Sequence, residues 1–337
     1  MYAEVLLLLL GGAGLMALAS GGDDADDAPA DGGADSDTVI RRIAGTDDDD
    51  DLGISTGGTR GETVILEGGD GDDMMWASDA SDNGTGDPIH RAELYGGDGN
   101  DTIYGFHHAD EVLLDGGAGN DAILGDATSW TPDTLRGGDG DDWLGSAADT
   151  IEGGAGNDTL VAFAVSPAGH TEAVVPGEPT PGTVYDPNMD DTPTVLTGGA
   201  GADSFTLGAG NWVERYDDIP EDVRPSPQMN DVIITDFDPS ADRLVLPEKV
   251  GAFHSRQFAD PGPGDILNTT ASFDGITVAP TEDGAGTILT ITYVPDQEAD
   301  LAPLTVRVTL ATVARFDPGS VTFRPYSAPG HDQAGLA

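Results

Sequence analysis

The sequence predicts an all-β protein built on an internal repeat, and three observations lead to this fold class. A Gly-Gly-x-Gly-x-Asp motif occurs six times between residues 68 and 203, the last copy with Ala202 at its fifth position. An apolar residue stands two positions before each glycine pair, and another stands two positions after each aspartate. Beyond the repeats, residues 272–323 alternate between apolar and polar in the manner of antiparallel strands.

Each copy of the motif contributes three glycines and one aspartate at fixed positions. These residues are Gly68, Gly69, Gly71 and Asp73; Gly96, Gly97, Gly99 and Asp101; Gly116, Gly117, Gly119 and Asp121; Gly137, Gly138, Gly140 and Asp142; Gly153, Gly154, Gly156 and Asp158; and Gly198, Gly199, Gly201 and Asp203. The apolar residues before the glycine pairs are Leu66, Leu94, Leu114, Leu135, Ile151 and Leu196, and those after the aspartates are Met75, Ile103, Ile123, Leu144, Leu160 and Phe205. A solvated linker has no physical reason to keep apolar residues at two fixed offsets, so we expect the repeats to build a common core.

The residue types in the motif suit the binding of a calcium ion. Glycine reaches positive φ without a steric penalty, which lets backbone carbonyl groups converge. Ca²⁺ binds about six to eight oxygen atoms at about 2.3–2.6 Å, and the motif offers carbonyl oxygens and one carboxylate. Because one loop cannot supply the full shell, each ion is expected to bridge two neighbouring loops.

This pattern resembles the nonapeptide repeat of RTX (repeats-in-toxin) proteins, Gly-Gly-x-Gly-x-Asp-x-apolar-x. The resemblance covers roughly residues 60–210 and implies a parallel β-roll that binds Ca²⁺. It also implies that the glycines and aspartates named above form the metal sites, with Ca²⁺ as the cofactor. The apolar residues would then point inward from strands of about three residues and fill a narrow core.

The distances between the motifs indicate how the loops are arranged. Successive glycine pairs begin 28, 20, 21, 16 and 45 residues apart, compared with about 18 residues for one full turn made of two nonapeptides. We therefore expect the intact loops along one edge of the roll, with the best sites between the loops that begin at 96, 116, 137 and 153. The opposite edge carries degenerate turns around Asp110 and Asp149, which are expected to bind Ca²⁺ poorly.

Both ends of the array show weaker likenesses. Residues 45–52 resemble the degenerate turn that opens RTX arrays, but the fourth-position glycine is missing, so Asp50 is either a ligand or part of a solvated acidic run. Residues 231–246 resemble the segment that closes the array in serralysin-type proteins, which implies two strands that cover the open end of the roll. The alternation further on predicts a hairpin at 276–293 and a strand at 304–310.

These patterns divide the chain into three parts. The parts are residues 1–38, with an apolar segment and an acidic linker expected to be disordered; residues 39–210, with the roll and loop insertions at 77–93 and 162–195; and residues 211–337, with the C-terminal β cap and, by the resemblance, a type I secretion region. The apolar residues 5–19 are too few for a membrane span of about twenty. They are either a cleaved signal or short anchor, or an apolar start that is not cleaved.

The net charge limits the classes of partner. The chain has 62 acidic and 13 basic residues and a formal net charge of −49. Nucleic acid requires a cationic footprint and anionic membranes attract basic segments, so neither is an expected partner. Because the chain has no cysteine, metal rather than disulfides is the expected stabiliser of a secreted or surface-displayed protein. Nothing in the composition identifies a protein partner.

No motif in the sequence predicts catalytic residues. Ser55 lies in a Gly-x-Ser-x-Gly match, but five aspartates precede it and the strand–turn–helix context of a nucleophile elbow is missing. His107 and His108 are not followed by the Glu-x-x-His of a zinc protease. The sequence therefore predicts a calcium-binding protein without catalytic activity. The alternatives are a hydrolase with its site in residues 211–323 and a surface-layer or adhesive protein that uses residues 162–195.

Overall fold

The computed structural model of the chain describes residues 40–56, 63–79, 91–105, 111–125, 133–146, 150–163, 193–208, 211–214, 231–255, 266–296 and 303–325. Several residues discussed above lie outside these ranges, namely 5–19, 21–38, 80–90, His107, His108, Asp110, Asp149, 164–192 and the chain from 326 onward. The described elements are β-strands and one turn of 3-10 helix, η1 (Pro318–Ser320). A search of these ranges for an apolar helix long enough to cross a membrane finds none.

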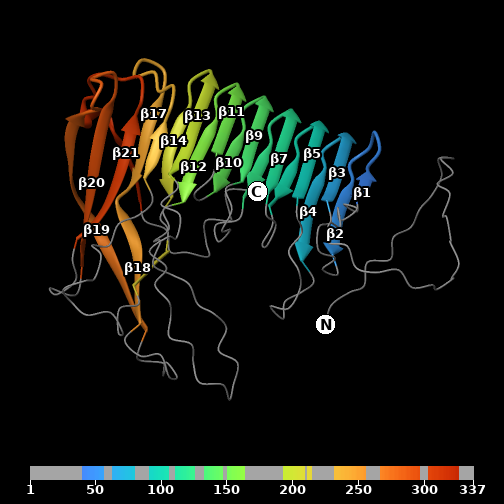
Figure 1. Ribbon diagram of the computed structural model, residues 1–337, viewed down its shortest axis with the longest axis horizontal. Helices are drawn as coiled ribbons and strands as arrows, with labels where there is room; N and C mark the ends of the chain where they lie inside the picture. The colour runs from blue at the N-terminus through green and yellow to red at the C-terminus, as the bar shows by residue number, and fades with distance from the viewer. Residues whose placement is uncertain are drawn as a thin grey trace, which may run out of the picture. The chain divides into compact units, whose positions relative to one another are not determined.

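The described strands form two sheets, which we call sheet A and sheet B (Figure 1). Sheet A contains, in spatial order, β1 (Ile40–Ala44), β3 (Thr63–Asp70), β5 (Arg91–Asp98), β7 (Val112–Ala118), β9 (Thr134–Asp139), β11 (Thr150–Ala155), β13 (Thr194–Ala200), β16 (Val232–Ile234), β21 (Leu304–Leu310), β20 (Thr287–Pro295), β19 (Ile266–Pro280), β18 (Lys249–Ser255) and β15 (Asn211–Glu214). Sheet B contains β2 (Asp51–Thr56), β4 (Met74–Asp79), β6 (Thr102–Tyr104), β8 (Ala122–Leu124), β10 (Trp143–Ser146), β12 (Thr159–Phe163), β14 (Ser204–Gly208), β17 (Arg243–Pro247) and β22 (Thr322–Arg324).

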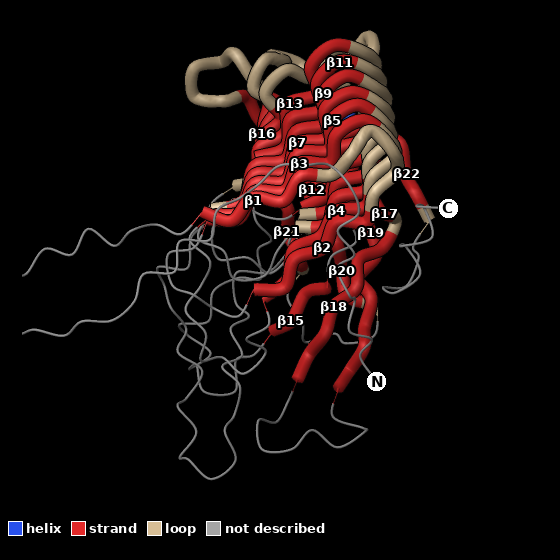
Figure 2. Tube along the Cα trace, turned by 90° about the vertical axis from the view of Figure 1, so that its right-hand side faces the viewer, coloured by secondary structure: helices blue, strands red, loops and turns tan. Residues whose placement is uncertain are grey.

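The chain alternates between the two sheets, so that one strand of each makes one coil. Every strand of the repeat region pairs in parallel with its counterpart in the next coil, as β3 does with β5 and β4 with β6. Equivalent motif positions are therefore aligned, and Leu66, Leu94 and Leu114 are register partners. Figure 2 shows the strands of successive coils stacked on one another. The predicted parallel β-roll is confirmed.

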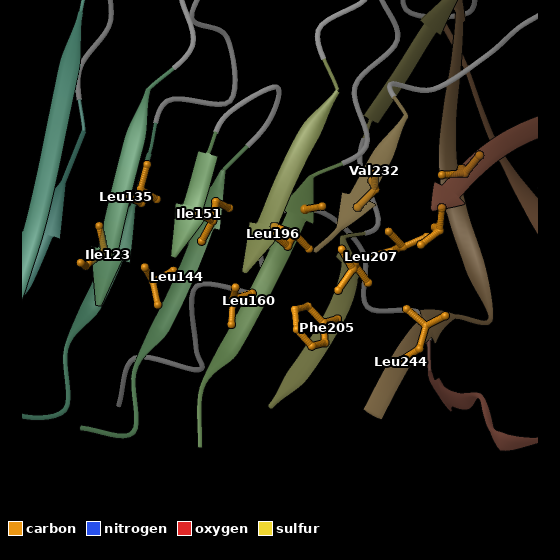
Figure 3. Close-up of a cluster of buried hydrophobic side chains, with 14 of the residues drawn as sticks. Ile123, Leu135, Leu144, Ile151, Leu160, Leu196, Phe205, Leu207, Val232 and Leu244 are labelled. Atoms are coloured by element: carbon orange, nitrogen blue, oxygen red, sulfur yellow. The ribbon is translucent and has the colours of Figure 1, made fainter. Parts of the chain in front are cut away.

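The core lies between the two sheets and consists of the predicted apolar positions. All twelve of these side chains are at most 1% exposed. Leu135 and Ile151 from sheet A meet Ile123, Leu144 and Leu160 from sheet B in this core (Figure 3). Burial of one such side chain contributes about 1.5–3 kcal/mol. The apolar spacing of the repeat thus predicted the core correctly.

The strands of sheet A are longer than the three residues expected. β5 has eight residues and buries Ala92 as well as Leu94, whereas β6 has three and buries Ile103. The pairing in sheet A continues through the glycine pairs, where Gly97 pairs with Gly117. Glycine has no side chain that could push the neighbouring strands apart, so the strand extends into the loop.

Residues 231–246 continue the roll instead of covering its end, which corrects the prediction. The two expected strands are present, but β16 pairs in parallel with β13 and β17 with β14, so that they form a further coil. The physical reason is the register, because Val232 and Ile234 alternate into the core in line with Thr194 and Leu196.

One more parallel strand follows in each sheet, because β21 pairs with β16 and β22 with β17, and antiparallel strands then extend sheet A. β21 pairs in parallel with β16 and antiparallel with β20, and it is the strand at which sheet A changes direction. β19 and β20 form the predicted hairpin. Aromatic rings fill this part of the core: the ring centroid of Phe237 lies 5.7 Å from that of Phe205 and 5.8 Å from that of Phe316.

A polar cluster around Asp296 ties β18, β19 and the end of β20 together. Lys249 Nζ donates to Asp296 Oδ2 at 2.8 Å. The hydroxyl groups of Thr270 and Ser272 donate to Oδ2 and Oδ1 at 2.5 Å. Burial disfavours the charge, but the hydrogen bonds from Lys249, Ser272 and Thr270 outweigh it and lower the pKa of Asp296 to about 2.

Asp296→Asn is expected to destabilise the protein at neutral pH by roughly 1–2 kcal/mol, because charge-assisted hydrogen bonds are lost. The folded pKa lies below the unfolded value of about 3.9. The contribution is therefore complete above about pH 4 and is lost as the pH falls towards about 2. The measurement is the difference in Tm between wild type and variant, which should shrink over this interval.

The control is Asp274→Asn, at an exposed carboxylate in β19, the strand that carries Thr270 and Ser272, which should leave the Tm unchanged throughout. A difference for Asp296→Asn that stays constant from pH 7 to pH 2 would contradict the assignment.

Candidate metal centre

The six intact motifs form loops that stack along one edge of the roll, which we call the loop edge. Each loop connects a sheet A strand to the next sheet B strand, as residues 70–74 connect β3 to β4. The second and fourth positions of every loop have positive φ, for example 107° at Gly117 and 140° at Gly119. A Cβ on Gly117 would also lie against the carbonyl oxygen of Gly97 in the preceding coil. Only glycine satisfies both requirements at this position.

The motif aspartates form a continuous series of hydrogen bonds along the loop edge, which we call the aspartate ladder. In each step, the backbone N–H of one aspartate donates to Oδ1 of the aspartate in the next coil. The steps run Asp50, Asp73, Asp101, Asp121, Asp142, Asp158, Asp203 and Asp242, with N···O distances of 2.7–2.9 Å. The carboxylates thus hold consecutive coils together before any metal is considered.

A second ladder runs beside the first in the opposite direction, and we call it the fifth-position ladder. Here the backbone N–H of a fifth-position residue donates to the side-chain Oδ1 of the preceding coil. The steps are Asp49, Asp72, Asn100, Asn120, Asp141, Asn157 and Ala202, at 2.7–3.1 Å. Sequence reasoning missed this role, although the signal was visible: five of the six motifs carry Asn or Asp at the fifth position.

Five of the motif aspartates keep a second oxygen without a hydrogen-bond partner. In the described part of the chain, the Oδ2 atoms of Asp73, Asp101, Asp121, Asp142 and Asp158 are buried and unpartnered. Each of these residues is at most 2% exposed. A buried carboxylate oxygen without a donor is costly, so the position of these atoms needs a physical explanation.

Each unpartnered oxygen faces a backbone carbonyl of the next coil across a space beside the first glycine of its loop. A Cβ on Gly68 would contact both Asp73 Oδ2 and the carbonyl oxygen of Gly96. The same pairing of a carboxylate and a carbonyl recurs beside Gly96, Gly116, Gly137 and Gly153. The first glycine of each motif is therefore required to keep open a space lined by oxygen atoms.

Burial changes the acidity of these carboxyl groups. Desolvation, followed by repulsion from neighbouring aspartates, raises the pKa of Asp121 to about 7. Desolvation likewise raises the pKa of Asp101 and of Asp158 to about 6. In the absence of a cation, the ionised form of these groups is therefore disfavoured.

The oxygen-lined spaces fit Ca²⁺ in their chemistry. Hard cations bind oxygen ligands, and each space combines the carboxylate of one coil with a carbonyl oxygen of the next. No three His, Asp or Glu side chains converge on one point within the described ranges. A cation at the loop edge would consequently depend on backbone oxygens and on the correct stacking of two coils.

The structure brings most, but not all, of the predicted site residues into such spaces. The loops that begin at 68, 96, 116, 137 and 153 each provide one. Beside Gly198, the Phe205 ring takes the place of the next carbonyl, although Asp203 Oδ2 is present. Asp50, for which two roles were considered, belongs to the aspartate ladder. Asp242 was missed, yet Asp242-Arg243-Leu244 keeps the offset between aspartate and apolar residue.

Comparison with protein families identifies the RTX calcium-binding nonapeptide repeat in this chain. Four matches cover residues 93–123, 111–129, 128–160 and 195–211. The resemblance inferred from the sequence is thereby confirmed. The loop at 68–73 lies outside these matches, although it takes part in the same aspartate ladder. A comparison with curated protein sequences finds no match.

The solved structures that are similar to this chain include the following two. One is the AlgE6R2 subunit of the Azotobacter vinelandii mannuronan C5-epimerase, with 20% identity, a TM-score of 0.17 and coverage of 59% of this chain and 96% of that one. The other is the extracellular lipase LipA from Serratia marcescens, with 13% identity, a TM-score of 0.17 and coverage of 86% of this chain and 41% of the lipase. We therefore describe the fold of this chain from the pairing of its own strands.

Gly117→Ala is expected to destabilise the loop edge by more than about 2 kcal/mol, because alanine is strained at φ 107° and its Cβ meets the Gly97 carbonyl. The measurement is the thermal midpoint in saturating Ca²⁺. Gly275→Ala is the control, since a Cβ there has no atom within 4 Å, and it should be tolerated. Equal Tm values for the two variants would show that the loop backbone is not constrained as described.

Proposed function

We propose that this chain, whose stacked loops are RTX calcium-binding repeats, is a secreted protein whose roll folds when it binds extracellular Ca²⁺. RTX nonapeptide repeats bind Ca²⁺. One observation supports the coupling of binding to folding: five buried carboxylate oxygens lie without a hydrogen-bond partner, each opposite a carbonyl oxygen of the next coil. A buried carboxylate oxygen in this position is costly unless a cation lies beside it.

Repulsion between the ladder carboxylates opposes folding, so the proposed Ca²⁺ is required for the roll to fold. Successive ladder aspartates follow each other along the loop edge, and Asp142 and Asp101 both raise the pKa of Asp121 by repulsion. Bound Ca²⁺ would supply the positive charge that compensates this repulsion. Because an unfolded chain has no preformed site, the free energy of metal binding becomes free energy of folding.

The proposed compartment follows from the same energetics. Extracellular calcium modules bind with dissociation constants of about 10⁻⁴–10⁻³ M, so the roll would stay unfolded in a low-calcium cytosol and fold outside. The net charge of −49 and the absence of cysteine are compatible with a secreted protein stabilised by metal. We also propose that the C-terminal region carries the secretion signal, and that the chain divides at residue 210, where this C-terminal region begins.

The described residues favour no catalytic alternative. Ser55 lies within strand β2, which pairs with β4, and not on a strand-to-helix turn. In the polar cluster of the C-terminal strands, a pKa of about 2 keeps Asp296 ionised and makes it a poor proton acceptor near neutral pH. The adhesive alternative rests on residues 162–195, most of which lie outside the described ranges. We therefore retain calcium-dependent folding as the proposed function.

Removal of Ca²⁺ is expected to unfold the roll. In excess chelator, the β-sheet signal in circular dichroism should be largely lost, and it should return on titration with Ca²⁺ at about 10⁻⁴–10⁻³ M. Mg²⁺ at the same concentration is the control, since it demands a tighter octahedral shell and keeps its water molecules. A full β-sheet signal in excess chelator would disprove the coupling.

Asp121→Asn is expected to raise the Ca²⁺ midpoint of folding on the order of tenfold, the equivalent of about 1.4 kcal/mol. The amide keeps an oxygen that can accept the ladder hydrogen bond from Asp101 N–H, so the variant removes the charge and spares the ladder. Asp139→Asn, at an exposed carboxylate of the next loop, is the matched control. If both variants shift the midpoint equally, the effect arises from net charge and not from the buried oxygen.

A further inference from the structure

The two ends of the aspartate ladder differ from its middle, and the difference lies in the second carboxylate oxygen. At Asp50, Oδ2 accepts hydrogen bonds from Thr46 N at 2.6 Å and from Thr46 Oγ1 at 2.9 Å. At Asp242, Oδ2 accepts a hydrogen bond from Asp238 N at 2.7 Å. The five aspartates that have unpartnered Oδ2 atoms lie between these ends.

Thr46 satisfies the second carboxylate oxygen of the first loop, so that this oxygen has donors without a metal ion. It stands at the second motif position, where every intact motif has glycine. Its hydroxyl group donates to Asp50 Oδ2 and accepts from Asp48 N at 3.2 Å, so it fixes the turn as well as the carboxylate. The space beside Gly45 still contains the Gly68 carbonyl oxygen, but the carboxylate opposite already has two donors.

The last intact loop is closed by a different arrangement. The carboxylate of Asp236 accepts hydrogen bonds from Gly198 N at 3.0 Å and from Gly199 N at 2.8 Å. Beside Gly198, the Phe205 ring replaces the carbonyl oxygen that lines the other spaces. Asp203 therefore faces an aromatic ring where Asp158 faces the carbonyl oxygen of Gly198.

We infer that the loop edge holds a closed row of five metal positions, terminated by the protein's own hydrogen-bond donors at one end and by an aromatic ring at the other. The row comprises the spaces at Asp73, Asp101, Asp121, Asp142 and Asp158. Asp50, Asp203 and Asp242 continue the aspartate ladder but hold no ion. The loop that begins at Gly198 contributes its carbonyl to the fifth position and opens no sixth. This inference rests on the proposed calcium binding and specifies where that binding stops.

Closing the row in this way has a physical advantage. A buried carboxylate oxygen that has neither a donor nor a cation beside it is costly. Hydrogen bonds from Thr46 or Asp238 satisfy such a carboxylate without a cation. The end loops can then keep their geometry at Ca²⁺ concentrations at which the middle of the row is not filled.

The test counts bound ions in the full chain by native mass spectrometry at saturating Ca²⁺. Asp73→Asn and Asp158→Asn should each lose one ion relative to wild type. Their ladder neighbours Asp50→Asn and Asp203→Asn should lose none. Melting in Ca²⁺ monitors the fold of each variant, and Asp50→Asn should lower the Tm modestly because the hydrogen bonds from Thr46 to a neutral amide oxygen are weaker than those to a carboxylate. Loss of an ion from Asp50→Asn or Asp203→Asn would overturn the inference.

A gain of binding provides the converse test. Thr46→Gly combined with Asp48→Gly rebuilds an intact motif in residues 45–50 and removes the hydroxyl donor from Asp50. This double variant should bind one ion more than wild type, and an unchanged count would show that Thr46 does not terminate the row. A wild-type chain that binds no Ca²⁺ would overturn the proposed function as well, so the two failures are distinguishable.

Discussion

The hydrogen bond between a backbone N–H and the aspartate Oδ1 of the next coil is the interaction on which the rest of the structure depends. It fixes one oxygen of each carboxylate on a neighbouring coil and turns the other oxygen into the interior. Asp101 shows both consequences, since its Oδ1 accepts from Asp73 N at 2.8 Å while its Oδ2 is buried without a partner. The ladder therefore joins the stacked coils and, through the same side chains, leaves a buried oxygen to which no protein group donates. The fifth-position ladder runs the other way and prevents a loop from shifting relative to its neighbour.

This arrangement explains why the roll tolerates such different lengths of chain between its loops. The residues joined by the aspartate ladder are separated by 16 positions between Asp142 and Asp158 and by 45 between Asp158 and Asp203, yet both N···O distances are 2.9 Å. The loop edge has one permitted backbone path, because glycines with positive φ and closely approaching carbonyl groups leave no room for variation. Length differences must then be accommodated elsewhere, and the entropic cost of closing a longer connection rises only slowly with its length.

Two kinds of stabilisation meet in sheet A. In the repeat region the apolar core is one narrow column, and the loop edge carries buried carboxylates that oppose folding without a cation. Beyond β16 the core contains aromatic rings such as Phe237 and Tyr293, and the carboxylate of Asp296 has protein donors. β21 is hydrogen-bonded to both regions. The coils with unpartnered carboxylate oxygens are thus attached directly to a sheet in which the carboxylate of Asp296 has protein donors.

The sequence by itself determined the coil, the core and the loop edge, because a strict period leaves one way to align identical motifs. The offsets of Leu94 and Ile103 from their motif were enough to identify buried residues, and the glycines were enough to identify the turns. Only the tertiary structure decided which aspartates of the ladder keep a buried oxygen without a partner. Whether Asp50 or Asp203 resembles Asp121 depends on which atoms of another coil, or of the same turn, face the second carboxylate oxygen. Such contacts are made by residues outside the repeat, such as Thr46 and Phe205, and no period in the sequence encodes them.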